Sequence, residues 1–274
     1  MKKKKTVRKN SSVSIFRPIP DDVASNIWSL IGNYDQQNWE VPKDRQLLAS
    51  IAGDAVTNTF YDITNSKVQN IALRNLLRDP LHSADTKKRN AAIRWIVYDW
   101  GNIPPQAEGE EDRLYAMCSE FTDYADEEVN DFAKKYKGDR IASWSKVLAF
   151  AESERYAIFD ARVAMSLNYI LDEIDFPRKF IMPSAISDPL NDIFSTIREK
   201  VNLHYQRKKL SYMGYMEYTQ LLRNFVAMGL AQNVLEAEMR LFANGEINAN
   251  KYAAKHGLKQ PYLKANQLKL DLAS

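Results

Sequence analysis

The 274-residue chain has few residues that bind metals or form disulfides: one cysteine, Cys118, and three scattered histidines, His82, His204 and His256. A single cysteine excludes an intramolecular disulfide and predicts a reducing compartment. The same scarcity leaves no zinc-type ligand cluster, so we expect no metal and no cofactor. The sequence also lacks an apolar run near the ~18 residues of a membrane span and the apolar core of a signal peptide. These absences predict a cytoplasmic protein without membrane contact.

Strand-like alternation is nearly absent, and only 9 glycines occur in the chain. Residues 156–159 form the best short extended piece, whereas most other apolar residues recur at helical spacing. We therefore predict an all-α fold, with one compact multi-helix domain at 16–256 and basic tails at 1–15 and 257–274. The predicted helices cover residues 23–31 (capped by Asp21 and Asp22), 45–60, 66–77, 85–99, 110–124, 127–136, 140–150, 161–170, 189–204, 215–243 and 249–256.

Charge is distributed unevenly along the chain. Residues 1–11 carry six Lys or Arg and no acid, and residues 251–274 carry five Lys and one acid. Because the whole chain has a net charge of +3, the body between these ends has a charge of −7. Basic ends can attract a polyanion over long range, or they can simply keep the chain soluble. The acidic body argues against a broad nucleic-acid surface, so any such surface must be local.

A basic segment opens the predicted helix at 140–150. Its cations surround a glycine that permits a tight turn with exposed backbone N–H groups, and the helix start adds partial positive charge. Such a turn can bind a phosphate oxygen; the alternative is an ordinary helix connection with solvated lysines. The residues concerned are Lys134, Lys135, Lys137, Gly138 and Arg140.

A single carboxylate follows the apolar run Tyr156-Ala157-Ile158-Phe159. Asp160 precedes the helix predicted at 161–170, where aspartate is a preferred N-cap for structural reasons alone. A carboxylate delivered by a buried segment can also lie in a partly desolvated site and activate water. Asp160 is therefore both a predicted helix cap and a candidate catalytic residue.

Taken together, Gly138-Asp139-Arg140-Ile141-Ala142-Ser143 and Ala157-Ile158-Phe159-Asp160 resemble the helix-hairpin-helix DNA glycosylase superfamily. The resemblance is to 8-oxoguanine DNA glycosylases and 8-oxoguanine glycosylase-like proteins of bacteria, whose hairpin reads Gly-x-Lys-x-Ala-Ser and is followed by Ala-Ile-x-Asp. It covers about 35 residues within the stretch 127–171, which would contain the hairpin and the catalytic helix. The resemblance implies a helix-hairpin-helix glycosylase fold and a nucleoid-associated bacterial enzyme. Its partner would be double-stranded DNA, from which a damaged or modified base is flipped out and excised.

Two departures from the family pattern narrow the expected chemistry. Arg140 occupies the position of the lysine that forms a Schiff base in bifunctional members, and a guanidinium stays protonated. Lys146 is a further candidate, but six residues along an α-helix rotate it by about 240°, so we do not expect it on the face of Arg140. The hairpin also has one glycine, Gly138, where the family usually has two. We therefore expect monofunctional base removal with Asp160 assisting the attack of water, and no lyase step.

The resemblance also suggests residues that would contact DNA. Trp144 is a candidate neighbour of the base pocket, with ordinary helix packing as the alternative, and Ser184 is a candidate pocket wall. Arg162 can pair with a phosphate or with an acid elsewhere. The expected DNA-binding residues are Lys135, Lys137, Gly138, Arg140 and Arg162.

Two other functions fit the same residues. One is a helix-hairpin-helix protein that binds DNA without catalysis, in a repair or phage-defence complex; the other is a helical interaction protein without a nucleic-acid role. Repair of damaged bases and antiviral defence against modified phage DNA are both compatible with the resemblance.

Overall fold

The computed structural model describes residues 18–32, 44–103, 105, 107–136, 139–183, 199 and 213–257. Every regular element in these ranges is a helix, with twelve α-helices and one π-helix, and the predicted all-α class is confirmed. Phe180 and Met213 form an isolated bridge. The helices are α1 (Asp21–Leu30), α2 (Arg45–Ala52), α3 (Asp54–Tyr61), α4 (Ser66–Leu81), α5 (Thr86–Arg94), η2 (Trp95–Trp100, the π-helix), α6 (Glu110–Cys118), α7 (Asp126–Tyr136), α8 (Ile141–Ala151), α9 (Ala161–Glu173), α11 (Tyr215–Ala227), α12 (Val234–Ala243) and α13 (Gly245–Lys255).

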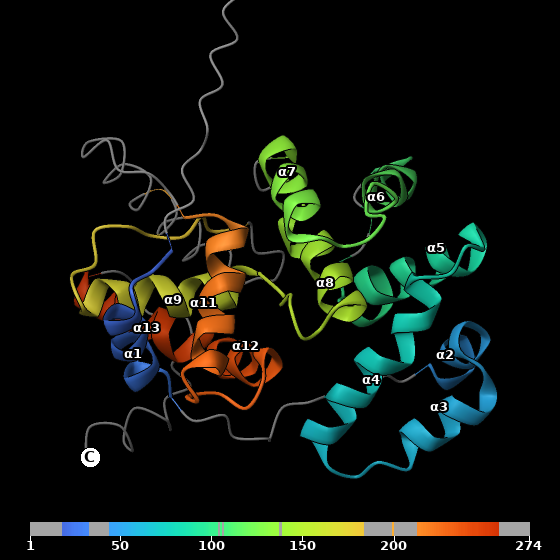
Figure 1. Ribbon diagram of the computed structural model, residues 1–274, viewed down its shortest axis with the longest axis horizontal. Coiled ribbons are helices and arrows are strands. Elements are labelled where there is room, and N and C mark those ends of the chain that lie inside the picture. Colours follow the sequence, from blue (N-terminus) through green and yellow to red (C-terminus); the bar gives the residue numbers. More distant parts are fainter. Residues whose placement is uncertain are drawn as a thin grey trace, which may run out of the picture.

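The helices form two groups that lie side by side (Figure 1). The central lobe consists of α2 to α8, in which α4 packs against α8 and α5. The terminal lobe combines α1 with α9, α11, α12 and α13, and α9 packs against α13, α12 and α1. Helices α7 and α11 touch across the boundary. The chain thus leaves the terminal lobe after α1 and returns to it through the segment that joins α8 to α9.

Polar side chains cap five of the helices. Each of these helices is preceded by an N-cap side chain that accepts a backbone N–H from the first turn: Asp44 before α2, Asn65 before α4, Asp85 before α5, Asp160 before α9 and Asn233 before α12. These bonds satisfy donors that have no partner within the helix. The predicted cap at Asp160 is confirmed, whereas Asp21 and Asp22 lie inside the first turn of α1, after Pro20, and make no side-chain cap.

Two predicted helices are each divided in the structure, and a glycine explains both divisions. Residues 45–60 form α2 and α3, which meet at Gly53 with φ of 99°. Residues 215–243 form α11 and α12, and Gly229, with φ of 71°, lies in the turn between them. Glycine adopts these left-handed values without the steric cost of a side chain.

Other helix ends differ from the predictions. Helix α4 continues through Pro80 to Leu81, because a proline in the last turn removes only one helical hydrogen bond. Helix α6 stops at Cys118 rather than Tyr124, which has a φ of 53°. The predicted stop at Gly101 is confirmed, although the preceding six residues are a π-helix. The helix predicted at 189–204, except for residue 199, and both predicted tails lie outside the described residues, apart from residue 257.

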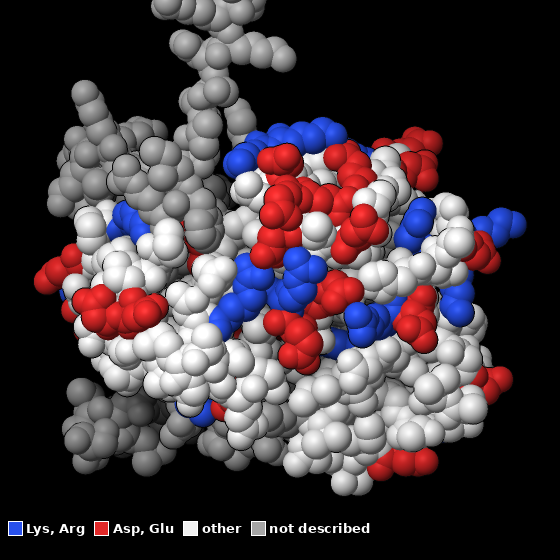
Figure 2. All heavy atoms as spheres, in the orientation of Figure 1, with Lys and Arg blue, Asp and Glu red and all other residues white. Residues whose placement is uncertain are grey.

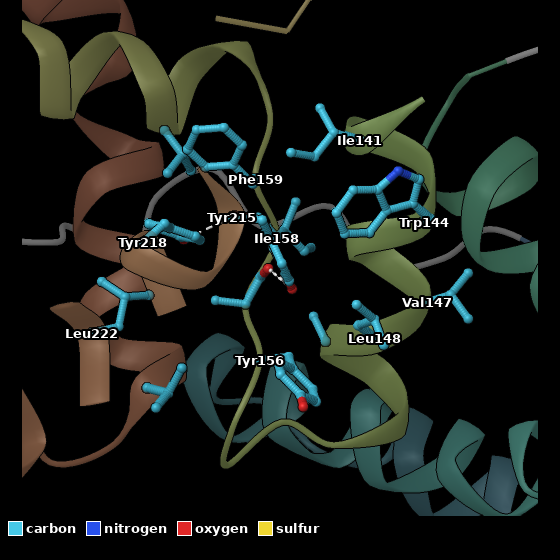
Figure 3. Packing of buried hydrophobic residues seen from close by; sticks show 14 of the residues in the cluster. Ile141, Trp144, Val147, Leu148, Tyr156, Ile158, Phe159, Tyr215, Tyr218 and Leu222 are labelled. Atoms are coloured by element: carbon cyan, nitrogen blue, oxygen red, sulfur yellow. Dashed lines mark hydrogen bonds between the residues drawn. The ribbon is translucent and has the colours of Figure 1, made fainter. Parts of the chain in front are cut away.

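One hydrophobic core runs through both lobes. Figure 3 shows its central part, where residues 156–159 lie between the side chains of α8 and those of α11. The side chains drawn there include Trp144, Val147 and Leu148 from α8 and Tyr218 and Leu222 from α11. No helix in the described ranges has both the length and the apolarity needed to cross a membrane.

Candidate active site

The segment at 156–160 crosses the lobe boundary without belonging to a helix or a sheet. Its buried backbone groups therefore need partners other than neighbouring strands. Two tyrosines of α11 supply donors: the Tyr215 hydroxyl donates to the carbonyl of Ala157 at 2.9 Å, and the Tyr218 hydroxyl donates to that of Ile158 at 2.8 Å. All four residues are buried. The terminal lobe thus fixes two carbonyl groups of the segment (Figure 3).

Acceptors for the N–H groups come from both lobes. The N–H of Phe159 donates to Ser145 Oγ of α8 at 3.0 Å, and the N–H of Ile158 donates to Glu238 Oε2 of α12 at 2.8 Å. Glu238 also forms a buried ion pair with Arg74 of α4, with Nη2 to Oε1 at 2.6 Å. Hydrogen bonds from three helices therefore determine where the residue after Phe159 lies.

That residue is Asp160, the half-buried N-cap of α9. Its Oδ1 accepts the backbone N–H groups of Arg162 and Val163, both at 3.0 Å. No described residue donates a hydrogen bond to Oδ2. One oxygen therefore holds the carboxylate in a fixed orientation, and the other has no donor among the described residues.

Lys146 lies close enough to Asp160 for the two charges to interact, although they belong to different helices. Its side chain is only 7% exposed, and Nζ donates to the carbonyl of Ala142 in its own helix at 3.0 Å. Burial lowers the pKa of Lys146; the negative charges of Asp160 and Glu238 oppose that shift, and the positive charge of Arg162 adds to it. Asp160 thus acts electrostatically on the lysine that sequence reasoning kept only as a further candidate.

Gly101 makes room for Lys146. A Cβ at position 101 would lie 3.0 Å from Cδ of Lys146 and 2.7 Å from the carbonyl oxygens of Ile96 and Val97. The π-helix η2 brings these carbonyls close to Gly101, whose N–H donates to Ile96 at 3.0 Å. Only glycine fits at this point, where η2 meets α8.

Arg140 has different neighbours from Lys146, and it precedes α8, whereas the sequence predicted that it opens the helix. Its backbone is left-handed, with φ of 52°, and its side chain is 9% exposed and paired with Glu110 of α6. Its charge also acts on Tyr98 and Cys118. The guanidinium is thus directed toward α6 and η2, so contact with DNA would require it to break its pair with Glu110.

The other described cations expected to bind DNA are also paired with acids. Lys135 donates to both oxygens of Glu120, at 2.7 and 2.8 Å, and Arg162 pairs with Glu246 at 3.0 Å. On the face shown in Figure 2, the Lys and Arg side chains of the described residues are interspersed with Asp and Glu and form no continuous basic surface. Lys137 and Gly138 lie outside the described residues.

Trp144 is part of the core. It is fully buried, its Nε1 donates to the carbonyl of Asp139 at 2.8 Å, and its ring packs against Phe132 and Tyr215. This position corresponds to ordinary helix packing, the alternative weighed for this residue, and leaves the ring no exposed face to stack on a base. Ser184, the candidate pocket wall, lies outside the described residues.

Within the described residues, no three His, Cys, Asp or Glu side chains lie close enough together to hold a metal ion. Comparison of the chain with protein-family models, curated proteins and solved structures finds no match. The case for a function therefore comes from the residues around Asp160.

Sequence reasoning missed Arg74, Glu238 and Gly101. A signal for the first two is present, because each charge lies on the buried face of its helix: Arg74 is three residues before the buried Leu77, and Glu238 is three before the buried Leu241. Two opposite charges at apolar positions indicate a buried pair. Gly101 was noted only as a helix stop.

Proposed function

We propose that the protein is a DNA glycosylase that hydrolyses the N-glycosidic bond of a damaged or modified base flipped out of duplex DNA. Asp160 would be its catalytic carboxylate, and the reaction would be monofunctional. The observation that supports this most is the geometry of Asp160, which has one oxygen fixed by the start of α9 and the other without a donor among the described residues, at the boundary of two helical lobes.

This geometry suits general-base assistance to water. As the water oxygen forms a bond with C1′ of the sugar, Oδ2 of Asp160 takes up one of its protons. The bond between C1′ and the base nitrogen breaks, and the base leaves with the electron pair and is protonated by solvent. Because Asp160 also carries negative charge, it stabilises the positive charge that develops on the sugar.

Two further features are compatible with the fold of helix-hairpin-helix glycosylases. Helix α7, helix α8, an extended segment and helix α9 follow one another along the chain, so two helices precede the helix that Asp160 caps. The extended segment also carries Asp160 from α8 of the central lobe to the start of α9 in the terminal lobe, and we propose that the flipped base reaches the carboxylate there.

Lys146 offers a different route, in which its amine attacks C1′ in place of water. Burial favours the neutral, nucleophilic amine, but Nζ faces the carbonyl of its own helix and the side chain is nearly inaccessible. We therefore keep water as the nucleophile and give Lys146 a supporting electrostatic role beside Asp160.

The test is a panel of duplexes, each carrying one 8-oxoguanine, uracil, hypoxanthine, ethenoadenine or glucosylated hydroxymethylcytosine. Each duplex is incubated with excess full-length protein and then heated in alkali to cleave abasic sites. We expect alkali-dependent cleavage of at least one duplex and no covalent complex after borohydride reduction. Cleavage without alkali, together with a trapped complex that Lys146→Met abolishes, would instead establish a lyase. Intact bases throughout the panel would contradict the proposal.

A second candidate is a helical DNA-binding or interaction protein without catalysis. It is favoured by the pairing of Lys135, Arg140 and Arg162 with acids of the same chain, which leaves little free positive charge among these residues. Such a protein would bind duplex DNA with a salt dependence set by the basic ends, or would not bind it at all, and it would release no base from any duplex of the panel.

A further inference from the structure

We propose that Glu238 is a positioning residue for the reaction at Asp160. By accepting the N–H of Ile158, its carboxylate fixes the extended segment two residues before Asp160 to the frame formed by α4 and α12. This inference rests on the proposed glycosylase function.

Both oxygens of Glu238 are occupied by buried donors. Oε1 accepts from Nη2 of Arg74 at 2.6 Å, while Oε2 accepts from Nη1 of Arg74 at 3.1 Å and from the N–H of Ile158 at 2.8 Å. The side chains of Arg74 and Glu238 are 1% and 3% exposed. One carboxylate thus joins the central lobe, the terminal lobe and the segment that carries Asp160.

A carboxylate held at both oxygens is a well-oriented acceptor. The segment has no neighbouring strand, so the buried N–H of Ile158 depends on this side chain for its hydrogen bond. Bidentate pairing with the planar guanidinium of Arg74 sets the orientation of the carboxylate. Because the carbonyl of Ile158 is bound to Tyr218, Glu238 completes the backbone hydrogen bonding of Ile158, and Ser145 binds the N–H of the next residue, Phe159.

Glu238 also contributes to the charge around the site. Its negative charge acts on Lys146 together with that of Asp160, against the burial that lowers the pKa of this lysine, and Arg162 acts in the opposite sense. The carboxylates of Glu238 and Asp160 thus act in the same sense on Lys146.

The experiment isolates the hydrogen bond from the ion pair. Both variants are made in full-length protein that carries Arg74→Met, because Arg74 would otherwise be left as a buried cation without its carboxylate. In this background Glu238 is replaced either by Gln or by Leu. Gln keeps an acceptor for the N–H of Ile158, and Leu has none. Amide exchange of Ile158 is followed by NMR, and single-turnover base release and DNA affinity are measured on whichever duplex of the panel the wild-type protein cleaves.

We expect amide exchange of Ile158 to be about tenfold faster in the Leu variant than in the Gln variant, as loss of one buried hydrogen bond implies. The single-turnover rate of the Leu variant should be about tenfold lower than that of the Gln variant, whereas the two should bind DNA with equal affinity. General destabilisation would not lower the rate and leave the affinity unchanged. Equal exchange in the two variants, or unequal exchange with equal rates, overturns the positioning role.

Two other outcomes are also decisive. If the Leu variant does not fold, Glu238→Met in the same background takes its place, since methionine also lacks a strong acceptor. If wild-type protein releases no base, the proposed function fails, and the role of Glu238 in the reaction fails with it. The exchange of Ile158 then still decides whether Glu238 holds the segment.

Discussion

The buried hydroxyl of Ser145 accepts the backbone N–H of Phe159 at 3.0 Å, which links the middle of α8 to the residue that precedes Asp160. Serine is otherwise an unfavourable residue in the interior of a helix, because its hydroxyl competes for backbone groups. Here the hydroxyl satisfies an N–H of the extended segment. The position of the candidate catalytic carboxylate thus depends on a side chain of the opposite lobe.

Replacing Ser145 with alanine should therefore destabilise the protein. The N–H of Phe159 would remain buried without an acceptor, which costs about 1–3 kcal/mol of unfolding free energy. Urea unfolding followed by circular dichroism measures this loss. Ser29→Ala is the matched control, because the hydroxyl of Ser29 is exposed and donates within α1, and its effect should stay within about 0.5 kcal/mol. Equal stabilities of the two variants would show that the bond to Phe159 contributes nothing.

Gly101→Ala should destabilise the protein for a different reason. The added Cβ would meet the carbonyl oxygens of Ile96 and Val97 at 2.7 Å, and backbone atoms cannot turn aside as a flexible side chain can. Overpacking of this kind costs about 1–3 kcal/mol. At Gly214, which also has negative φ, the nearest atom to a new Cβ is Oε2 of Glu217 at 3.4 Å, an ordinary contact. Thermal unfolding should leave Gly214→Ala close to wild type, and a Gly101→Ala variant that unfolds at the wild-type temperature would contradict the close packing of η2 on α8.

The charge on Lys146 predicts a pH-dependent stability. Burial holds the pKa of Lys146 in the folded protein below that of an unfolded chain, which is about 10.4. Between these two values the unfolded chain binds more protons, so the contribution of Lys146 to stability rises with pH across that window. Lys146→Met removes the charge, and the variant should be more stable than wild type at pH 7. That advantage should shrink as the pH approaches 10.

Urea unfolding at a series of pH values measures this difference. Lys134→Met serves as a control, because Lys134 is exposed beside Asp131 and its replacement should give a difference that hardly varies with pH. An advantage of Lys146→Met that stays constant from pH 7 to pH 10 would mean that this amine is not held in a buried environment.

The parts of the site that could be predicted from the sequence are local ones. An apolar run followed by aspartate and a helical pattern predicts a buried segment with an N-cap, and the structure shows both at 156–160. Arg140 is the left-handed N-cap of α8 and not part of the helix, so its direction could not be predicted from helical rotation. Trp144 lies one turn from Arg140, but whether its ring faces a pocket or the core depends on Phe132 and Tyr215, which come from other helices.

The remaining features depend on contacts between distant residues. Arg74 and Glu238 are paired although many helices separate them in the chain, and no local pattern specifies which acid meets which base. The same is true of the approach of Lys146 to Asp160. The helix breaks at Gly53 and Gly229 were missed because glycine is tolerated within helical patterns, and only its φ reveals the turn.

The most direct test of the central claim is the rate of base release by Asp160→Asn under single-turnover conditions. Asparagine caps helices as well as aspartate does, so the two bonds from Arg162 and Val163 and the fold should persist. Loss of the general base predicts a rate lower by a factor on the order of 10² to 10⁴, with DNA affinity and melting temperature near those of wild type. An Asp160→Asn protein that releases the base as fast as wild type would show that this carboxylate is a helix cap and not the catalytic group.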